Sequence, residues 1–222
     1  MSVGASPTSQ VKPIVFIVDD DISVRESLEL LICSAGWQPE TFASAQAFLS
    51  RPPATTPTPT CLVLDIELPG LNGLELQERI AVDRSEMPII FITGHADVPR
   101  AIRAMKGGAV EFLTKPFADD VLLQALKRAI ERSRRALGRA AELKVLRERY
   151  ASLTPREREV LPLVVGGLLN KQAAAELGIS KVTLQIHRGK VMRTMGAGSL
   201  AELVRMAGAL EIPVTRSRRS WK

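Results

Sequence analysis

The sequence predicts an α/β domain with a doubly wound, five-stranded parallel sheet, followed by an all-α domain of four helices. Two observations support this prediction. Short apolar runs alternate with longer amphipathic stretches up to residue 126, and only helical patterns remain after it. The charge also changes: residues 1–126 hold nine Lys and Arg against sixteen Asp and Glu (net −7), and residues 127–222 hold twenty-one against eight (net +13). An acidic half joined to a basic half indicates two domains, the second with a polyanionic partner.

The strands of the first domain are predicted from short apolar runs. Four are strongly apolar and should be buried: Ile14–Val18, Cys61–Leu64, Ile89–Ile92 and Val110–Leu113. A weaker run covers Trp37–Phe42, and helical patterns such as Val24–Ala35 and Val98–Lys106 lie between the strands. The stretch Arg51–Thr60 is rich in proline, which lacks the amide donor of a helix or a central strand, so it predicts an exposed loop.

The second half of the chain has the pattern of a helical domain. An Arg-, Glu-, Ala- and Leu-rich pattern over Lys127–Arg149 predicts one helix that runs on into a linker. Thr154-Pro155-Arg156-Glu157 is a capping box with proline at the first helical position, which marks a helix start. Pro162 falls inside this helix and should kink it. Three more helices are predicted, with a tight Gly178-Ile179-Ser180 turn after the first: Lys171–Leu177, Lys181–Met195 and Leu200–Ala209.

The composition argues against membrane-spanning proteins, secreted proteins and proteins with a disulfide framework. No run of 18 or more apolar residues occurs, so we expect no membrane partner. Residues 1–12 lack the apolar segment of a signal peptide and are interpreted as a short tail. Two cysteines, Cys33 and Cys61, do not make a disulfide framework, so we expect a reduced, cytoplasmic setting in which both are ordinary core residues.

Polar residues that could hold a metal ion or a phosphoryl group stand at the ends of four predicted strands: Asp19, Asp20, Asp21, Asp65, Thr93 and Lys115. The carboxyl ends of parallel strands meet at one edge of a sheet, so these side chains should gather there. Clustered carboxylates repel one another and suit a hard cation such as Mg²⁺. A carboxylate beside such an ion, a hydroxyl and an ammonium can accept a phosphoryl group. An Asp run after a strand is also a common helix N-cap, but the joint pattern favours a site.

The wording around these positions resembles a receiver domain of two-component response regulators, over residues 14–126. The matching segments are IVDDD, LDIELPGLNG, FITGHAD and FLTKPF. The resemblance implies a flavodoxin-like fold in which Asp65 accepts the phosphoryl group. It also implies a site for Mg²⁺, or for Mn²⁺ in its place, whose ligands are Asp20 directly, Asp19 through water, Asp65 and the main-chain carbonyl of Glu67.

The same resemblance implies the residues that respond to the phosphoryl group. Lys115 should pair with it, and the Lys115–Pro116 peptide bond should be cis. Thr93 should move toward the phosphoryl group, and Phe112 occupies the aromatic switch position coupled to Thr93, although simple core packing also explains a Phe there. Asp21 is taken as secondary, and His95 as a loop residue that faces a partner.

Residues 153–210 resemble the four-helix, helix-turn-helix DNA-binding domain of the LuxR/NarL type. The matching segments are LTPREREVL, LLNKQAAAELGIS and KVTLQIHRGKVMRTM, and the HRGKVM wording is similar to the FixJ, TodT and StyR branch. A helical wheel at about 100° per residue places Leu184, His187, Val191 and Met195 on one face, which should pack on the domain core, with His187 hydrogen-bonded.

The rest of that helix supplies the predicted DNA contacts. A helix of this kind fits the major groove, where Gln185 can read adenine and exposed Val182 or Ile186 can contact thymine methyl groups. Lys and Arg supply phosphate contacts. Gly189 is explained equally by close approach to DNA and by tolerated drift. The predicted set is Lys181, Val182, Gln185, Ile186, Arg188, Gly189, Lys190 and Arg193.

Together these features predict a response regulator with four parts: a receiver domain (13–127), a helical linker (128–150), a LuxR-type domain (151–211) and a basic tail (212–222). A sensor histidine kinase would phosphorylate Asp65, and phosphorylation would control homodimerisation and binding to promoter DNA, with RNA polymerase as a further partner. The protein would not be an enzyme beyond promoting its own dephosphorylation.

Two alternatives belong to other classes. A phosphohydrolase of the haloacid dehalogenase type needs a second aspartate two residues after the nucleophile, where this chain has Glu67. A phosphorylation-independent DNA-binding protein would have a degenerate receiver, and the intact set of Asp20, Asp65, Thr93 and Lys115 argues against it.

Overall fold

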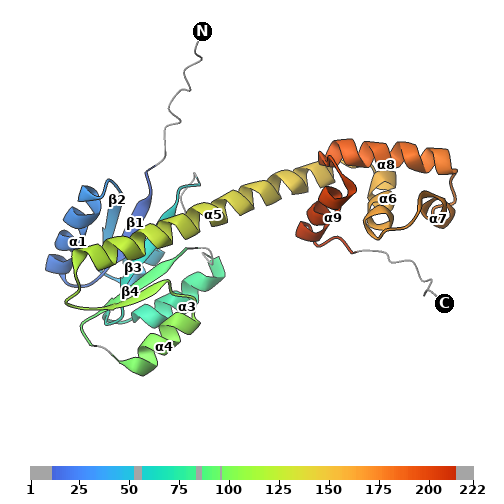
Figure 1. The fold of residues 1–222 in the computed structure, drawn as a ribbon. Coiled ribbons are helices and arrows are strands. Elements are labelled where there is room, and N and C mark those ends of the chain that lie inside the picture. The colour runs from blue at the N-terminus through green and yellow to red at the C-terminus, as the bar shows by residue number, and fades with distance from the viewer. Residues whose placement is uncertain (1–11, 53–56, 84–86, 96, 214–222) are drawn as a thin grey trace, which may run out of the picture. The chain divides into compact units, whose positions relative to one another are not determined.

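The computed structural model describes residues 12–52, 57–83, 87–95 and 97–213 (Figure 1). The chain divides into two compact units, with the boundary between Gly138 and Arg139, and each is described by itself. Most of the predicted tails, 1–12 and 212–222, and part of the predicted loop at 51–60 lie outside the described residues. None of the described helices combines the length and apolar character needed to cross a bilayer.

The N-terminal unit contains a five-stranded parallel sheet with strand order β2-β1-β3-β4-β5. The strands agree with the predicted runs to within one or two residues at each end, and the doubly wound α/β fold is confirmed. Their bounds are β1 (Ile14–Val18), β2 (Gln38–Phe42), β3 (Thr60–Asp65), β4 (Ile89–Thr93) and β5 (Glu111–Thr114).

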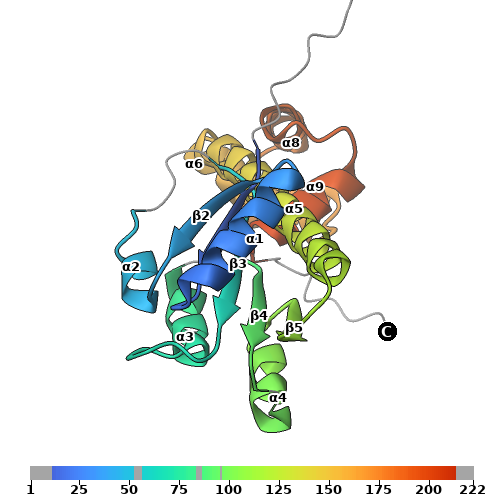
Figure 2. The ribbon, with the colours of Figure 1, turned by 90° about the vertical axis from the view of Figure 1, so that its left-hand side faces the viewer.

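Helices cover both faces of this sheet, as Figures 1 and 2 show. On one face, α1 and α5 pack Leu28 and Leu126 against Val63 and other inward side chains of the strands. On the other face, α2, α3 and α4 pack against a second cluster that includes Phe91. The bounds are α1 (Ile22–Ser34), α2 (Ala45–Leu49), α3 (Gly73–Asp83), α4 (Val98–Lys106) and α5 (Asp119–Ala151).

The last helix of the N-terminal unit extends beyond residue 127, where the predicted receiver domain ends. Ala129, Ile130 and Ala136 are buried, and Ser133 Oγ accepts a hydrogen bond of 3.0 Å from the amide of Thr60 at the start of β3. The core of this unit therefore uses α5 almost as far as the boundary at Gly138.

The C-terminal unit contains four helices after α5, as predicted: α6 (Pro155–Val165), α7 (Asn170–Glu176), α8 (Lys181–Met195) and α9 (Leu200–Ala209). The capping box is present, because Thr154 N donates to Glu157 Oε2 (3.0 Å) and Glu157 N donates to Thr154 Oγ1 (3.3 Å). Although Pro162 lies inside α6, it leaves one continuous helix. A single apolar core, which includes Leu161, Leu184 and Leu203, joins these helices.

A glycine closes helix α8. Gly196 has a φ of 72° and caps the helix in the left-handed conformation, which an L residue rarely adopts. A Cβ on Gly196 would lie only 2.6 Å from Nη1 of Arg149, and this Nη1 donates to the carbonyl of Met195 at 2.9 Å. The C-terminal end of α8 is therefore fixed by α5 of the same unit.

Candidate functional site

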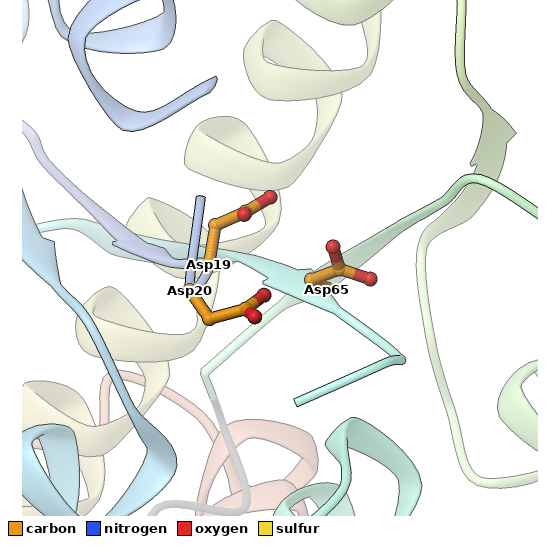
Figure 3. Close-up of side chains that lie close together, drawn as sticks. All are labelled: Asp19, Asp20 and Asp65. Carbon is orange, nitrogen blue, oxygen red and sulfur yellow. The ribbon is translucent and has the colours of Figure 1, made fainter. Parts of the chain in front are cut away.

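Three carboxylates meet at the carboxyl edge of the sheet, as Figure 3 shows: Asp19 and Asp20 after β1, and Asp65 at the end of β3. Their oxygens lie within 4.8 Å of one another. Because β1 and β3 are adjacent parallel strands with Val18 opposite Leu64, the residues that follow are brought side by side. Asp19 is 0% exposed and Asp65 is 6% exposed, whereas Asp20 is open to solvent.

Lys115 joins this cluster from the far edge strand. Its Nζ donates to Asp19 Oδ2 at 2.7 Å and to Asp65 Oδ2 at 2.8 Å, and the Lys115–Pro116 bond is cis as expected. Burial alone would lower the pKa of Lys115, but its bonds to both carboxylates outweigh burial and raise the pKa above its ordinary value. Burial raises the pKa of Asp19, and hydrogen bonds from Lys115 and the Asp21 amide offset only part of that rise.

The loop between β1 and α1 is held by backbone and side-chain hydrogen bonds. Asp21 is the N-cap of α1 and accepts a bond of 2.8 Å from the amide of Ser23, so its role is the ordinary capping one. Arg25 Nη1 donates to the main-chain carbonyls of Asp19 (2.7 Å) and Asp20 (2.9 Å). Arg25 was not among the residues predicted for the site; its signal in the sequence is a cation one turn into the helix that follows the acidic run.

The loop between Asp65 and α3 is also fixed by hydrogen bonds. The amide of Glu67 donates to Asp65 Oδ1 at 3.0 Å, and the amide of Gly73 donates to the carbonyl of Ile66 at 3.0 Å. A Cβ on Gly73 would lie only 2.3 Å from the carbonyl oxygen of Asp65. The start of α3 therefore packs directly against the backbone of the candidate phosphoacceptor.

These residues fit a divalent cation. Three carboxylates whose oxygens converge within 4.8 Å are a hard-oxygen donor set of the kind that Mg²⁺ prefers. In the structure the side chain of Glu67 is used elsewhere, since its carboxylate pairs with His95 Nδ1 (3.1 Å) and Arg100 Nη1 (3.3 Å). Of Glu67, only the main-chain carbonyl is thus a candidate ligand.

Thr93 and Phe112, the expected switch residues, occupy neighbouring strands. Thr93 ends β4 and is buried, and its Oγ1 exchanges hydrogen bonds of 3.2 Å with the main chain of His95. Phe112 lies in β5 opposite Phe91 and packs half-buried against the core. The hydroxyl of Thr93 is therefore engaged with its own loop.

The carboxylate cluster opens to an adjoining cavity of about 690 Å³. Asp20 and Glu67 line it on one side, and Arg100 and Arg103 of α4 line it on another. The side chain of His95, in the loop after β4, is 81% exposed and pairs with Glu67 at the rim of this cavity. Of the three carboxylates, Asp20 is therefore the one that faces this cavity.

The core residues and the predicted DNA-contacting residues of helix α8 lie on different sides of the helix. Leu184, Val191 and Met195 are buried as expected. Nδ1 of His187 is buried and has no hydrogen-bond partner among the described residues, so the expected hydrogen bond of this side chain is absent there.

Most of the predicted DNA contacts are open to solvent on the other side of α8: Lys181, Val182, Gln185, Ile186, Lys190 and Arg193 are exposed, and Gly189 is half-exposed. Arg188 differs, because it is half-buried and its Nη1 donates to Asn170 Oδ1 of α7 at 2.9 Å. Its guanidinium thus links the two helices of the turn.

Comparison with known proteins assigns a family to each of the two units. Residues 15–127 match the response regulator receiver domain, and residues 151–207 match the bacterial regulatory proteins of the luxR family. Nodulation protein W of Bradyrhizobium diazoefficiens is 46% identical over 218 residues (98% of this chain, 95% of that protein). Response regulator protein TodT of Pseudomonas putida is 40% identical over 198 residues (89% and 86%). The structure of response regulator StyR is 44% identical, with a TM-score of 0.75 over 89% of this chain and 98% of that one.

Proposed function

Because this chain belongs to the response regulators that join a receiver domain to a LuxR-family DNA-binding domain, we propose that a phosphoryl group on Asp65 controls its binding to promoter DNA. The position of Lys115 is the observation that best supports phosphorylation at Asp65. Lys115 Nζ lies between the buried carboxylates of Asp19 and Asp65, at 2.7 Å and 2.8 Å. An ammonium in that place can neutralise charge on a group newly attached to Asp65.

The donor would be the phosphohistidine of a sensor kinase. An oxygen of Asp65 attacks phosphorus, the phosphorus–nitrogen bond of the donor breaks, and the leaving imidazole takes up a proton. Asp19, Asp20, Asp65 and the carbonyl of Glu67 would hold Mg²⁺, or Mn²⁺ in its place, which supplies positive charge to the phosphoryl oxygens. Lys115 keeps a bond to Asp19 and donates to a phosphoryl oxygen. Water that later attacks the phosphorus of the acyl phosphate breaks its bond to the Asp65 oxygen, which releases inorganic phosphate and returns Asp65 to its free carboxylate form.

Two local contacts would then change. Thr93 leaves the main chain of His95 and donates its hydroxyl to a phosphoryl oxygen. Phe112, half-buried on the neighbouring strand β5, changes its packing together with Thr93. The phosphoryl group acts only by its preference for one of two existing conformations.

The output would be a dimer on DNA. A changed receiver surface that favours a homodimer brings two LuxR-type domains to a two-fold site, which raises their effective concentration. RNA polymerase would be the partner that responds to the bound dimer.

The alternative as a phosphohydrolase is not supported by the site. That chemistry needs a free acid or base two residues after the nucleophile, and the Glu67 carboxylate is paired with His95 and Arg100. The compact arrangement of Asp19, Asp65 and Lys115 also disfavours a degenerate receiver.

The test is DNA binding by fluorescence anisotropy, using a duplex selected from a randomised pool by the protein itself. Wild type and Asp65→Asn are compared with and without acetyl phosphate and Mg²⁺. We expect the phosphodonor to tighten binding of wild type only. Equal affinity in all four samples would refute control by phosphorylation and leave the DNA-binding domain assigned.

A further inference from the structure

The loop that joins β1 to α1 carries two of the three clustered carboxylates, those of Asp19 and Asp20 (Figure 3). Like charges this close repel one another, so other groups must fix their positions. The amide of Asp19 donates to the carbonyl of Phe42 (3.2 Å), and its carboxylate accepts bonds from the Asp21 amide (2.9 Å) and from Lys115 Nζ (2.7 Å). Asp20 is exposed, and in the part of the chain that the structure describes its carbonyl alone is hydrogen-bonded.

Arg25, in the first turn of α1, holds that carbonyl and the one before it. Its Nη1 donates to the carbonyl of Asp19 at 2.7 Å and to the carbonyl of Asp20 at 2.9 Å. The two carbonyls belong to the peptide planes on either side of the Asp20 Cα, and the backbone turns there only about φ and ψ. Bonds from one nitrogen to both planes therefore restrict φ and ψ of Asp20, and with them the direction of its Cβ.

Helix α1 gives no reason of its own for a cation at position 25. The N-terminal end of a helix carries a partial positive charge, so a cation in the first turn is unfavourable there. Within the described ranges, the half-buried guanidinium of Arg25 bonds to the two loop carbonyls and pairs with no carboxylate. Its contacts are therefore with the loop that carries Asp19 and Asp20.

We propose, on the basis of the metal site inferred above, that Arg25 is a positioning residue for Mg²⁺. It keeps the carboxylate of Asp20 beside those of Asp19 and Asp65 before the ion binds. This role has a definite sign. A cation that merely lay near the site would oppose Mg²⁺, and its removal would tighten binding. Removal of a positioning group weakens binding, because part of the binding free energy must then order the loop.

The test is isothermal titration calorimetry of the full chain with Mg²⁺, without phosphodonor and without DNA. Arg25→Met removes the charge and both bonds but has a similar helix propensity. It should bind Mg²⁺ at least about tenfold more weakly, the usual effect of losing a group that orients a metal ligand. Arg25→Lys keeps the charge on a side chain one bond shorter, and its affinity should lie between those of Arg25→Met and wild type.

Arg135→Met is the matched control. The side chain of Arg135 is 71% exposed on α5 and pairs with Glu131 at 3.1 Å. This variant loses the same charge from the same unit without touching the loop, so it should bind Mg²⁺ as wild type does.

A second measurement separates positioning from a general loss of structure. The rate of phosphorylation by acetyl phosphate is followed against Mg²⁺ concentration for wild type and Arg25→Met. The half-saturating Mg²⁺ concentration should rise by the factor found in calorimetry. The maximal rate should stay close to that of wild type, because a bound ion itself holds Asp20 in place.

The outcomes separate the two proposals. If wild type shows no Mg²⁺ binding, the proposed metal site fails and the role of Arg25 fails with it. If wild type binds Mg²⁺ and Arg25→Met binds it equally or more tightly, only the positioning role is overturned. A lower maximal rate at an unchanged half-saturating Mg²⁺ concentration would also overturn it, since Arg25 would then only stabilise the fold.

Discussion

A methyl group added at Gly73 should disturb both the stability of the receiver domain and the chemistry at Asp65. The Cβ of Gly73→Ala would lie 2.3 Å from the carbonyl oxygen of Asp65 and 3.0 Å from Cα of Ile66. All of these are backbone atoms, so no side chain can rotate to relieve the overlap. The start of α3 and the end of β3 must therefore move apart by roughly 1 Å, the shortfall from an ordinary van der Waals contact.

The expected magnitude follows from two opposing effects. Overpacking of this kind typically costs about 1–3 kcal/mol, and replacing a helical glycine with alanine returns about 0.5–1 kcal/mol. At the midpoints of these two ranges the net loss is about 1.2 kcal/mol, which should lower the unfolding temperature of this unit by roughly 4–5 °C. Because a 1 Å misplacement of a reacting group can cost about 100-fold in rate, phosphorylation of Asp65 should slow by about ten- to 100-fold.

The assay combines thermal unfolding followed by circular dichroism with phosphorylation by acetyl phosphate followed on phosphate-affinity gels. Gly138→Ala is the matched control, because a Cβ there meets no atom within 4 Å and the residue lies in the interior of α5. It should raise stability by about 0.5–1 kcal/mol and leave phosphorylation unchanged. Wild-type stability and phosphorylation rate in Gly73→Ala would show that this close contact does not constrain Asp65.

Three further results are expected. Lys115→Met should lower the unfolding temperature of the metal-free protein, because it leaves the buried carboxylates of Asp19 and Asp65 without their cation. The same variant should bind Mg²⁺ about tenfold more tightly or better in calorimetry, because a competing cation is gone, and weaker Mg²⁺ binding would contradict this. Hydrogen bonding by the Thr154 amide lowers the pKa of Glu157 in the folded protein. The ionised carboxylate therefore stabilises the C-terminal unit at pH values above the unfolded-state pKa, and this contribution disappears as the pH falls through the lowered folded-state pKa. Glu157→Gln should remove that part of the acid-unfolding curve, and an unchanged curve would show that Glu157 makes no such contribution. Cys61 is buried as expected, whereas Cys33, also expected in the core, is exposed. Because burial raises the pKa of the Cys61 thiol, iodoacetamide should modify Cys33 in the folded protein and Cys61 only after denaturation, as mass spectrometry of the two peptides would report; labelling of both thiols at one rate would contradict the core position of Cys61.

Elements with a strong local pattern were predictable from the sequence. The bounds of β1, α4, α8 and α9 agree with the predicted ranges because each is bracketed by clear start and stop signals. The meeting of Asp19, Asp65 and Lys115 was also predictable, since parallel topology alone brings strand ends to one edge.

Other features depend on tertiary contacts that no local pattern encodes. Helix α2 has only five residues and is fixed by Phe48, whose ring packs 5.5 Å from that of Phe16. Arg25 is placed by two carbonyls of a loop, and Arg188 by a side chain of another helix. The unpartnered Nδ1 of His187 likewise depends on which groups surround it in the fold.

The extension of the N-terminal core along α5 has a consequence for recombining such regulators. The match to the receiver family ends at residue 127, yet Ile130 and Ala136 are buried and Ser133 holds the amide of Thr60. A fusion that joined a foreign output domain at residue 127 would exchange these core side chains for unrelated ones. A junction after Gly138 keeps the core of the receiver half intact, and transplantation between relatives should succeed there more often than at the limit of sequence similarity.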